Sequence, residues 1–166
     1  MSSDLQTNWP WIVKLFEQGL VRTGFYAFAT VSPDGSPHMA PYGSLVLNGD
    51  CSGYYCEVFP NQMAQNLIDN QHICVMATNF GMWYWLKGLF LGRFDQWPGI
   101  RLYGTTGKIR KAEPGEVEKF SVRVKRFKLL KGYNLLWKNI HNVRDIRFTH
   151  FQPIRLGAMT RHLLNK

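Results

Sequence analysis

The 166-residue sequence is short of cysteine, and the few cysteines it has form no metal or disulfide pattern. Cys51, Cys56 and Cys74 are odd in number and include no Cys-x-x-Cys pair. The five histidines are scattered without the spacing of metal ligands. A disulfide framework and a zinc site are therefore excluded, and the cysteines are interpreted as small buried residues in a reducing compartment.

The usual catalytic signatures are also missing. The chain contains no Gly-x-Ser-x-Gly, His-Glu-x-x-His, P-loop or Gly-x-Gly-x-x-Gly motif. Its 11 acidic residues are too few and too dispersed to suggest the carboxylate pair of a glycosidase. If the protein is an enzyme, its chemistry is therefore expected to belong to a bound cofactor.

No hydrophobic run is long enough to cross a membrane. The most apolar segment, Phe80 to Gly92, is interrupted by Lys87 and is too short for a bilayer. The start, MSSDLQTNWPW, lacks the charged and apolar regions of a secretory signal. We therefore expect a cytoplasmic protein without a membrane span.

Positive charge is abundant. Lys and Arg total 20 against 11 Asp and Glu, a net charge of +9, which suits phosphate-bearing ligands, nucleic acid or an anionic surface. Apolar residues make up 45% and aromatic residues 14% of the chain, so disorder is not expected. The length favours one domain over residues 1–166.

Hydrophobic periodicity predicts a β-rich chain with helices. A helix is predicted over 9–19 with Gly19 as its C-cap, and further helices over 61–70 and 117–127. A long aromatic loop is expected over 79–99. The order predicts an α+β fold, a small antiparallel barrel of six or so strands with flanking helices. Strands are predicted over 24–31, 38–47, 51–56, 72–78 (buried on both faces), 99–110 (bulged at its glycines) and 145–156.

Two local features suggest a ligand. Pro37 and Pro41 fall in one predicted strand, so this strand either lies at a sheet edge or turns its backbone toward something other than another strand. Asn61 is a plausible N-cap for the helix that follows, and such a helix start can bind phosphate, with Gln62 as a further donor.

The ordered pattern FYAFATVSPDGSPHMAPYGSLVLNGDCSGYYCEVFPNQMAQNLIDNQHICVMAT, followed by RLYGTTGKIRKAEPGE, resembles the pyridoxamine 5′-phosphate oxidase-like, FMN-binding split β-barrel superfamily. The resemblance covers residues 20–120. It implies a split antiparallel barrel and a homodimer with FMN at the subunit interface. The favoured function is therefore an FMN-dependent oxidoreductase that transfers hydride or electrons, through flavin N5, to a small-molecule substrate.

The same resemblance assigns candidate cofactor-binding residues by position. It places one strand along the flavin ring, the next beside the ribityl phosphate and the start of the following helix at the phosphate. No general acid or base is assigned. In that order the residues are His38, Met39, Ala40, Pro41 and Tyr42, then Tyr55 and Cys56, then Asn61, Gln62 and Asn66.

One departure from the family pattern leaves the cofactor open. Gln62 and Met63 stand where family members often carry a basic pair, so Arg93, Arg101 or Arg155 is expected to supply the missing charge. Alternatively, the chain binds haem or a deazaflavin in place of FMN.

Two alternative functions follow. One is a non-catalytic flavin or haem binder, with His38, His150 or His162 as haem ligand. The other, less favoured, is a nucleic-acid-binding barrel, suggested by the basic and aromatic residues over 123–148.

Overall fold

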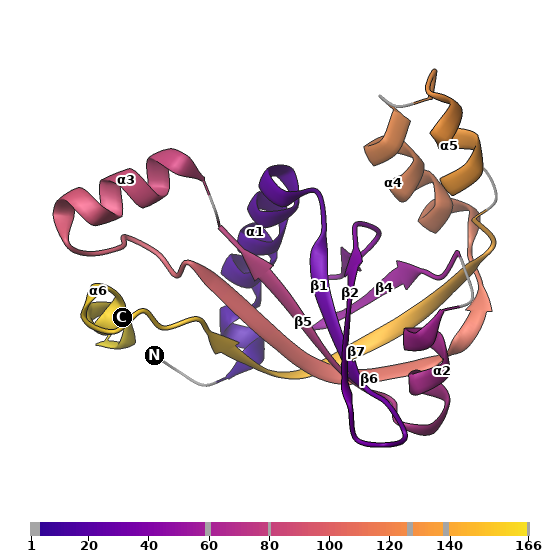
Figure 1. The fold of residues 1–166 in the computed structure, drawn as a ribbon, viewed down its shortest axis with the longest axis horizontal. Coiled ribbons are helices and arrows are strands. Elements are labelled where there is room, and N and C mark those ends of the chain that lie inside the picture. The colour runs from indigo at the N-terminus through magenta and orange to yellow at the C-terminus, as the bar shows by residue number, and fades with distance from the viewer. Residues whose placement is uncertain (1–3, 59–60, 80, 126–127, 138–139, 166) are drawn as a thin grey trace.

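A seven-stranded antiparallel sheet forms the centre of the computed structural model, which describes residues 4–58, 61–79, 81–125, 128–137 and 140–165 (Figure 1). Its strand order is β2-β1-β5-β6-β7-β4-β3. The predicted α+β class is confirmed, with seven strands where six or so were expected. The strands are β1 (Tyr26–Val31), β2 (Pro37–Tyr42), β3 (Val46–Leu47), β4 (Ser52–Cys56), β5 (His72–Thr78), β6 (Gly99–Lys111) and β7 (Asn142–Pro153).

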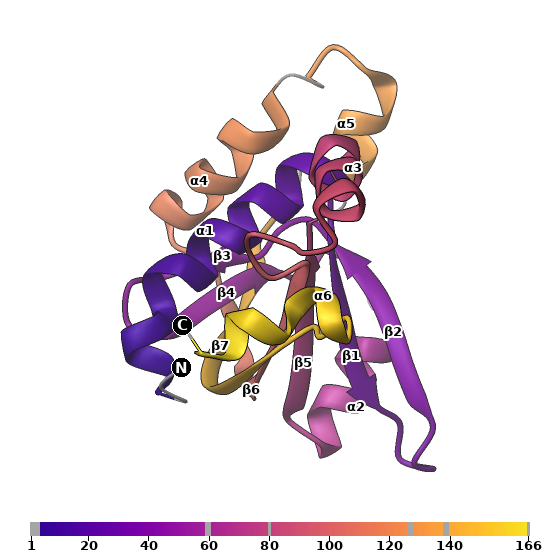
Figure 2. The same cartoon turned by 90° about the vertical axis from the view of Figure 1, so that its left-hand side faces the viewer.

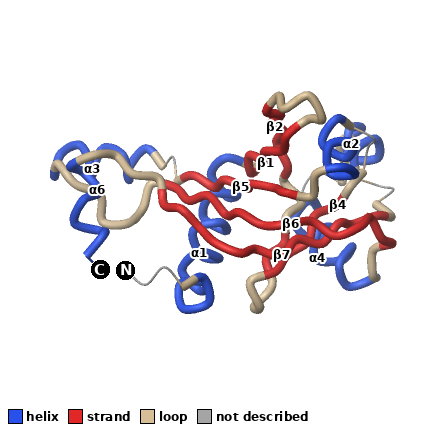
Figure 3. Tube along the Cα trace, turned by 90° about the horizontal axis from the view of Figure 1, so that it is seen from below, coloured by secondary structure: helices blue, strands red, loops and turns tan. Residues whose placement is uncertain are grey.

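The sheet curves into a split barrel. β2 and β3 lie at opposite ends of the strand order, yet only residues 43–45 separate them along the chain. A flat sheet would hold these strands far apart, because neighbouring strands are spaced by about 4.8 Å. The two edges must therefore approach each other, and Figure 3 shows the curvature of the sheet from below.

Helices cover and flank this sheet. α1 packs along it and buries Trp9, Ile12 and Phe16 against β1, β5 and β6 in the main core (Figure 2). α3 extends from one end of the molecule, and α4 and α5 lie at the other (Figure 1). None of the described helices is long and apolar enough to cross a membrane. The helices are α1 (Leu5–Thr23), α2 (Gln62–Asp69), α3 (Met82–Leu91), α4 (Pro114–Val124), α5 (Lys131–Leu136), α6 (Ala158–Arg161) and the short 3-10 helix His162–Asn165.

The first helix ends later than predicted. Gly19 lies inside α1, and the C-cap is Gly24, with φ of 79° and its N–H donating to the Leu20 carbonyl over 2.8 Å. Gly19 instead lets the helix approach β5, because a Cβ there would stand 3.1 Å from the Thr78 carbonyl oxygen. Gly19 therefore serves close packing of α1 on β5 and does not cap the helix.

The segment 79–99 is not a loop throughout. α3 occupies Met82–Leu91 and ends at Gly92, which has φ of 64°. Phe80, within the same segment, lies outside the described residues. The expectation of a long aromatic loop is therefore wrong for residues 82–91, which form α3.

Two strand predictions had different outcomes. Ile73, Val75 and Ala77 of β5 are buried, whereas Cys74 and Met76 on its other face are half-buried, so the expectation that both faces are buried is wrong. The predicted irregularities of β6 are confirmed. Its pairing with β7 shifts register between Tyr103 and Gly104 and again between Thr106 and Ile109.

Candidate functional site

A cavity of about 1080 Å³ lies between β2, the first turn of α2, the C-terminal part of α1 and the α4–α5 region. This volume is at the upper end of the range for small-molecule sites, about 300–1,000 Å³. The cavity wall combines apolar side chains, including Phe120 and Trp137, with amide and charged groups. The described residues thus form a site large enough for a cofactor.

Most of the predicted cofactor-binding residues meet at this cavity. They come from β2, from the end of β4 and from the start of α2, three segments that the fold brings together. The predicted residues that line the cavity are His38, Ala40, Pro41, Tyr42, Cys56, Asn61 and Gln62.

Met39, Tyr55 and Asn66 do not line it. Met39 alternates with His38 and Ala40 along β2 and is 62% exposed. Tyr55 is fully buried in the core, with its ring 5.3 Å from that of Tyr42. The sequence pattern placed these residues beside the right strands, but their side chains point elsewhere.

Asn66 is a buried structural residue. Its Nδ2 donates to Thr30 Oγ1 over 3.1 Å, and its Oδ1 accepts from Gln62 Nε2 over 2.9 Å. The Asn66 amide therefore joins α2 to β1, and it also orients Gln62 at the cavity wall.

The prolines of β2 fit an edge strand. β2 is the end strand of the sheet and pairs with β1, so the lost N–H groups of Pro37 and Pro41 break no central ladder. Pro41 also lines the cavity. The two explanations offered for the prolines therefore apply together: β2 lies at a sheet edge, and it also borders the cavity.

Asn61 is the N-cap of α2, as predicted. Its Oδ1 accepts from the Ala64 N–H over 2.9 Å, and its Nδ2 donates to Tyr42 OH over 2.7 Å. Burial raises the pKa of Tyr42, although the Asn61 hydrogen bond partly opposes this shift. The Tyr42 hydroxyl is therefore neutral at physiological pH and is fixed at the wall.

Cys56 is held beside Ser44. The Cys56 N–H donates to Ser44 Oγ over 3.1 Å. Burial raises the pKa of the Cys56 thiol to about 11. At neutral pH this thiol is protonated, so it is a poor nucleophile and serves as an apolar part of the wall.

Sequence reasoning missed Arg123. This α4 residue lines the cavity, and its Nη1 donates to the Leu45 carbonyl over 2.6 Å. No carboxylate of the described residues forms an ion pair with it. The sequence signal was weak, because Arg123 lies at the border of the apolar face that carries Phe120 and Val124.

The three arginines proposed from sequence lie elsewhere. Arg93, Arg101 and Arg155 are all absent from the described residues that line the cavity. Among the described residues, Arg123 is the arginine that an anionic group in this cavity would contact.

Of the histidines proposed for haem, His38 alone lines the cavity among the described residues. His150 stacks on Tyr103, with ring centroids 4.6 Å apart. His162 Nε2 lies 2.9 Å from the Phe94 carbonyl oxygen. No cluster of three or more His, Cys, Asp or Glu within the described chain could hold a metal ion.

These observations define a class: a split β-barrel protein with a ligand cavity beside the N-terminus of a helix. The model of the family described as pyridoxamine 5′-phosphate oxidase matches residues 13–147, so the chain belongs to that family. The resemblance inferred from the sequence is thereby confirmed.

Several solved structures share this fold. HupZ of Group A Streptococcus has a TM-score of 0.58 at 18% identity, covering 90% of this chain and 96% of its own. An FMN-binding protein from Syntrophomonas wolfei has a TM-score of 0.56 at 16% identity, covering 92% and 95%. At such low identity, the likeness shows the fold alone.

Two further structures widen the range of cofactors. HutZ, the haem storage protein of Vibrio cholerae, has a TM-score of 0.53 at 12% identity, covering 86% of this chain and 94% of its own. An F420 reductase has a TM-score of 0.51 at 17% identity, covering 77% and 88%. FMN, haem and a deazaflavin, the three cofactors expected from the sequence, thus all occur with this fold. No curated protein sequence matched the chain significantly.

Proposed function

We propose that the protein binds FMN in the cavity beside β2 and is an FMN-dependent oxidoreductase acting on a small molecule. The observation that carries this proposal is the cavity of about 1080 Å³, which gathers seven of the ten residues assigned by family resemblance. The likeness to an FMN-binding protein supports the same choice. FMN, when bound, supplies hydride or electron transfer through its ring nitrogen N5.

The cavity residues fit the two parts of this cofactor. Ala40 and Pro41 of β2, together with Trp137, would hold the flat ring. The first turn of α2 would receive the phosphate, because N–H groups and the positive end of the helix dipole favour an anion there. Arg123 would add a positive charge in place of the missing basic pair.

Spectroscopy and titration test this proposal. The purified protein should show a flavin spectrum or take up FMN stoichiometrically, with FMN bound more tightly than riboflavin because the site recognises the phosphate. Equal affinity for FMN and riboflavin would contradict the phosphate site. Failure to bind either flavin would contradict the function.

A haem-binding role is the second candidate, favoured by the position of His38 at the cavity wall and by the likeness to HutZ. Haem titration should then give a Soret band, which His38→Ala should shift or abolish. A haem spectrum that is unchanged in this variant would exclude His38 as the ligand.

We further propose a homodimer with the cofactor at the subunit interface. The exposed side chains of α3 support an interface, since Trp83 is 83% and Phe90 91% exposed. Not every aromatic side chain near α3 is exposed, because Phe94 is fully buried and Tyr84 and Trp85 pack on it. The three free cysteines support a cytoplasmic location, where thiols stay reduced.

A further inference from the structure

The positive charge of this protein is concentrated in one segment. Residues 119–144 contain eight of the 20 Lys and Arg residues and none of the 11 acidic ones, so they carry eight of the nine net charges. The rest of the chain is almost neutral. The described residues of α4, of α5 and of the turn between them (114–125 and 128–137), here called the α4–α5 hairpin, carry Lys119, Arg123, Lys125, Lys128 and Lys131 against Glu116 and Glu118.

The outer surface of the hairpin also exposes large aliphatic side chains. Leu129 is 99%, Leu135 78% and Val122 66% exposed. Lys128 and Lys131 flank the turn and are exposed as well. Lys128 and Lys131 thus stand next to exposed leucines along the chain, and the core does not cover these side chains.

The described aromatic residues of the hairpin face inward instead. Tyr133 and Trp137 pack against the second hydrophobic cluster, which includes Phe120, Val124 and Val143. Their rings meet edge to face, with centroids 5.9 Å apart. Among the described residues of the hairpin, the exposed large side chains are therefore aliphatic, and no aromatic ring faces outward to stack on nucleic-acid bases.

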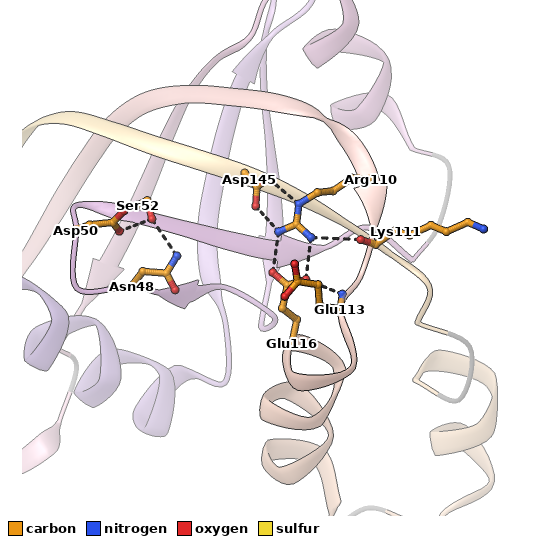
Figure 4. Close-up of polar contacts among 8 residues, drawn as sticks. All are labelled: Asn48, Asp50, Ser52, Arg110, Lys111, Glu113, Glu116 and Asp145. Carbon is orange, nitrogen blue, oxygen red and sulfur yellow. Dashed lines mark hydrogen bonds and ion pairs between the residues drawn. The ribbon is translucent and has the colours of Figure 1, made fainter.

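The hairpin is anchored to the sheet by ion pairs at its base. Arg110 of β6 donates to both carboxylate oxygens of Glu116 over 2.7 and 2.8 Å, and to Asp145 of β7 (Figure 4). Opposite this attachment, α4 and α5 lie at the far end of the molecule from α3 (Figure 1). The ion pairs therefore hold α4 against the sheet, and the exposed side chains of the hairpin lie on the side that faces away from the sheet.

We propose that the α4–α5 hairpin docks the protein onto an anionic lipid bilayer surface, with lysines at the headgroups and leucines in the acyl region. The apolar face of α4 packs into the second hydrophobic cluster, so the exposed leucines and lysines of the hairpin would supply the apolar and electrostatic attraction that bind a membrane interface. A second copy is disfavoured as occupant, because two such surfaces would repel each other. Single-stranded nucleic acid is disfavoured because Tyr133 and Trp137, the described aromatic residues of α5 and its C-cap, pack inward.

Vesicle binding of the full chain tests the proposal. We expect the protein to co-sediment with vesicles of phosphatidylcholine and phosphatidylglycerol, to bind pure phosphatidylcholine vesicles much less, and to lose binding as salt rises. Equal binding to neutral and anionic vesicles, or none to either, would overturn it. Tight binding to a single-stranded oligonucleotide without vesicle binding would assign the surface to nucleic acid and overturn it as well.

Paired variants separate the contribution of the lysines to vesicle binding from that of the leucines. Lys128→Gln with Lys131→Gln should weaken binding to anionic vesicles by about 30-fold, since each lysine near such a surface contributes about fivefold. The matched control, Lys14→Gln with Lys108→Gln, changes the net charge equally outside the hairpin and should have little effect. Equal losses in both pairs would mean attraction by net charge alone and would contradict a docking surface.

The apolar contribution has its own control. Leu129→Asn with Leu135→Asn should weaken vesicle binding by roughly tenfold or more, because two exposed leucines no longer enter the bilayer. The control, Ile68→Asn with Ile109→Asn, alters side chains that are 73% and 48% exposed on other elements. Unchanged binding in the leucine variant would contradict the proposal. None of these readouts depends on flavin, so the proposed cofactor can fail independently.

Discussion

At the scale of single residues, Asn61 connects the fold to the cavity through one amide. Its oxygen caps α2 and its nitrogen fixes the Tyr42 hydroxyl at the cavity wall. Stability and ligand binding therefore depend on different atoms of the same side chain, and they can be separated by mutation.

Asn61→Ala is expected to lower the free energy of unfolding by about 1 kcal/mol through loss of the cap. FMN affinity should fall by more than this, because the first turn of α2 and Tyr42 both lose their support. Denaturant unfolding and FMN titration measure the two effects. Asn61→Ser is the control, since it keeps a capping oxygen but loses the donor to Tyr42. Equal losses of stability and affinity in Asn61→Ala would make Asn61 a cap only.

At the scale of elements, the β6–β7 pair depends on one glycine far more than on another. A Cβ at Gly104 would overlap the backbone of Arg147, which cannot move without breaking the pairing. At Gly107, in the second register shift, the nearest atom to a Cβ is 3.9 Å away. Both glycines occur at bulges, but close backbone approach explains only the first.

Gly104→Ala should therefore destabilise the protein by about 3 kcal/mol, as steric overpacking does in rigid surroundings. Gly107→Ala should change stability by no more than about 0.5 kcal/mol. Urea unfolding of the two variants provides the comparison. Similar stability losses would show that backbone conformation, and not contact with β7, determines the need for glycine.

The attachment of α4 should respond to acid. The Arg110 hydrogen bonds hold the pKa of the Glu116 carboxyl below its usual value of 4.5, so the unfolded chain binds this proton more readily than the folded one. The stabilisation is complete above about pH 4.5 and is lost as pH falls below that value.

Glu116→Gln should cost about 1 kcal/mol at pH 7, since Arg110 is partly exposed and solvent screens the pair. The stability difference between wild type and Glu116→Gln should shrink as pH falls below 4.5. Thermal unfolding at a series of pH values measures it. A difference that stays constant down to pH 3 would rule out the ion pair as its source.

At the scale of the whole molecule, FMN binding and dimerisation should be linked. A ligand held between two chains stabilises the dimer by mass action, so FMN should raise the dimer fraction at low protein concentration. Light scattering on dilute samples with and without FMN measures this. A monomer that retains FMN on dilution would contradict a cofactor at the interface.

The same measurement applies to α3. Trp83→Ser with Phe90→Ser should raise the monomer fraction, because these side chains have no cover within the described chain. Ile68→Ser, on α2, is the control. Unchanged association in the α3 variant would place the interface elsewhere.

The sequence by itself determined the local elements and the family. The alternating strands, the turn at residues 32–36 and the N-cap at Asn61 follow from backbone chemistry that acts over a few residues, and the structure contains them. The order of these elements was also enough to identify the family, which the match over residues 13–147 confirmed. The same local rules misplaced the end of α1, because a glycine that permits close packing looks like one that caps a helix.

Only the tertiary structure decided which side chains share the cavity. Arg123 is 78 residues from Leu45, the residue whose carbonyl it contacts, and no local pattern could bring them together. Asn66 and Tyr55 were assigned to the site by position, but the direction of each side chain placed it in the core. Sequence periodicity shows which residues of a helix or strand share a face. The packing of α4 against the curved sheet determines which of those faces lines the cavity.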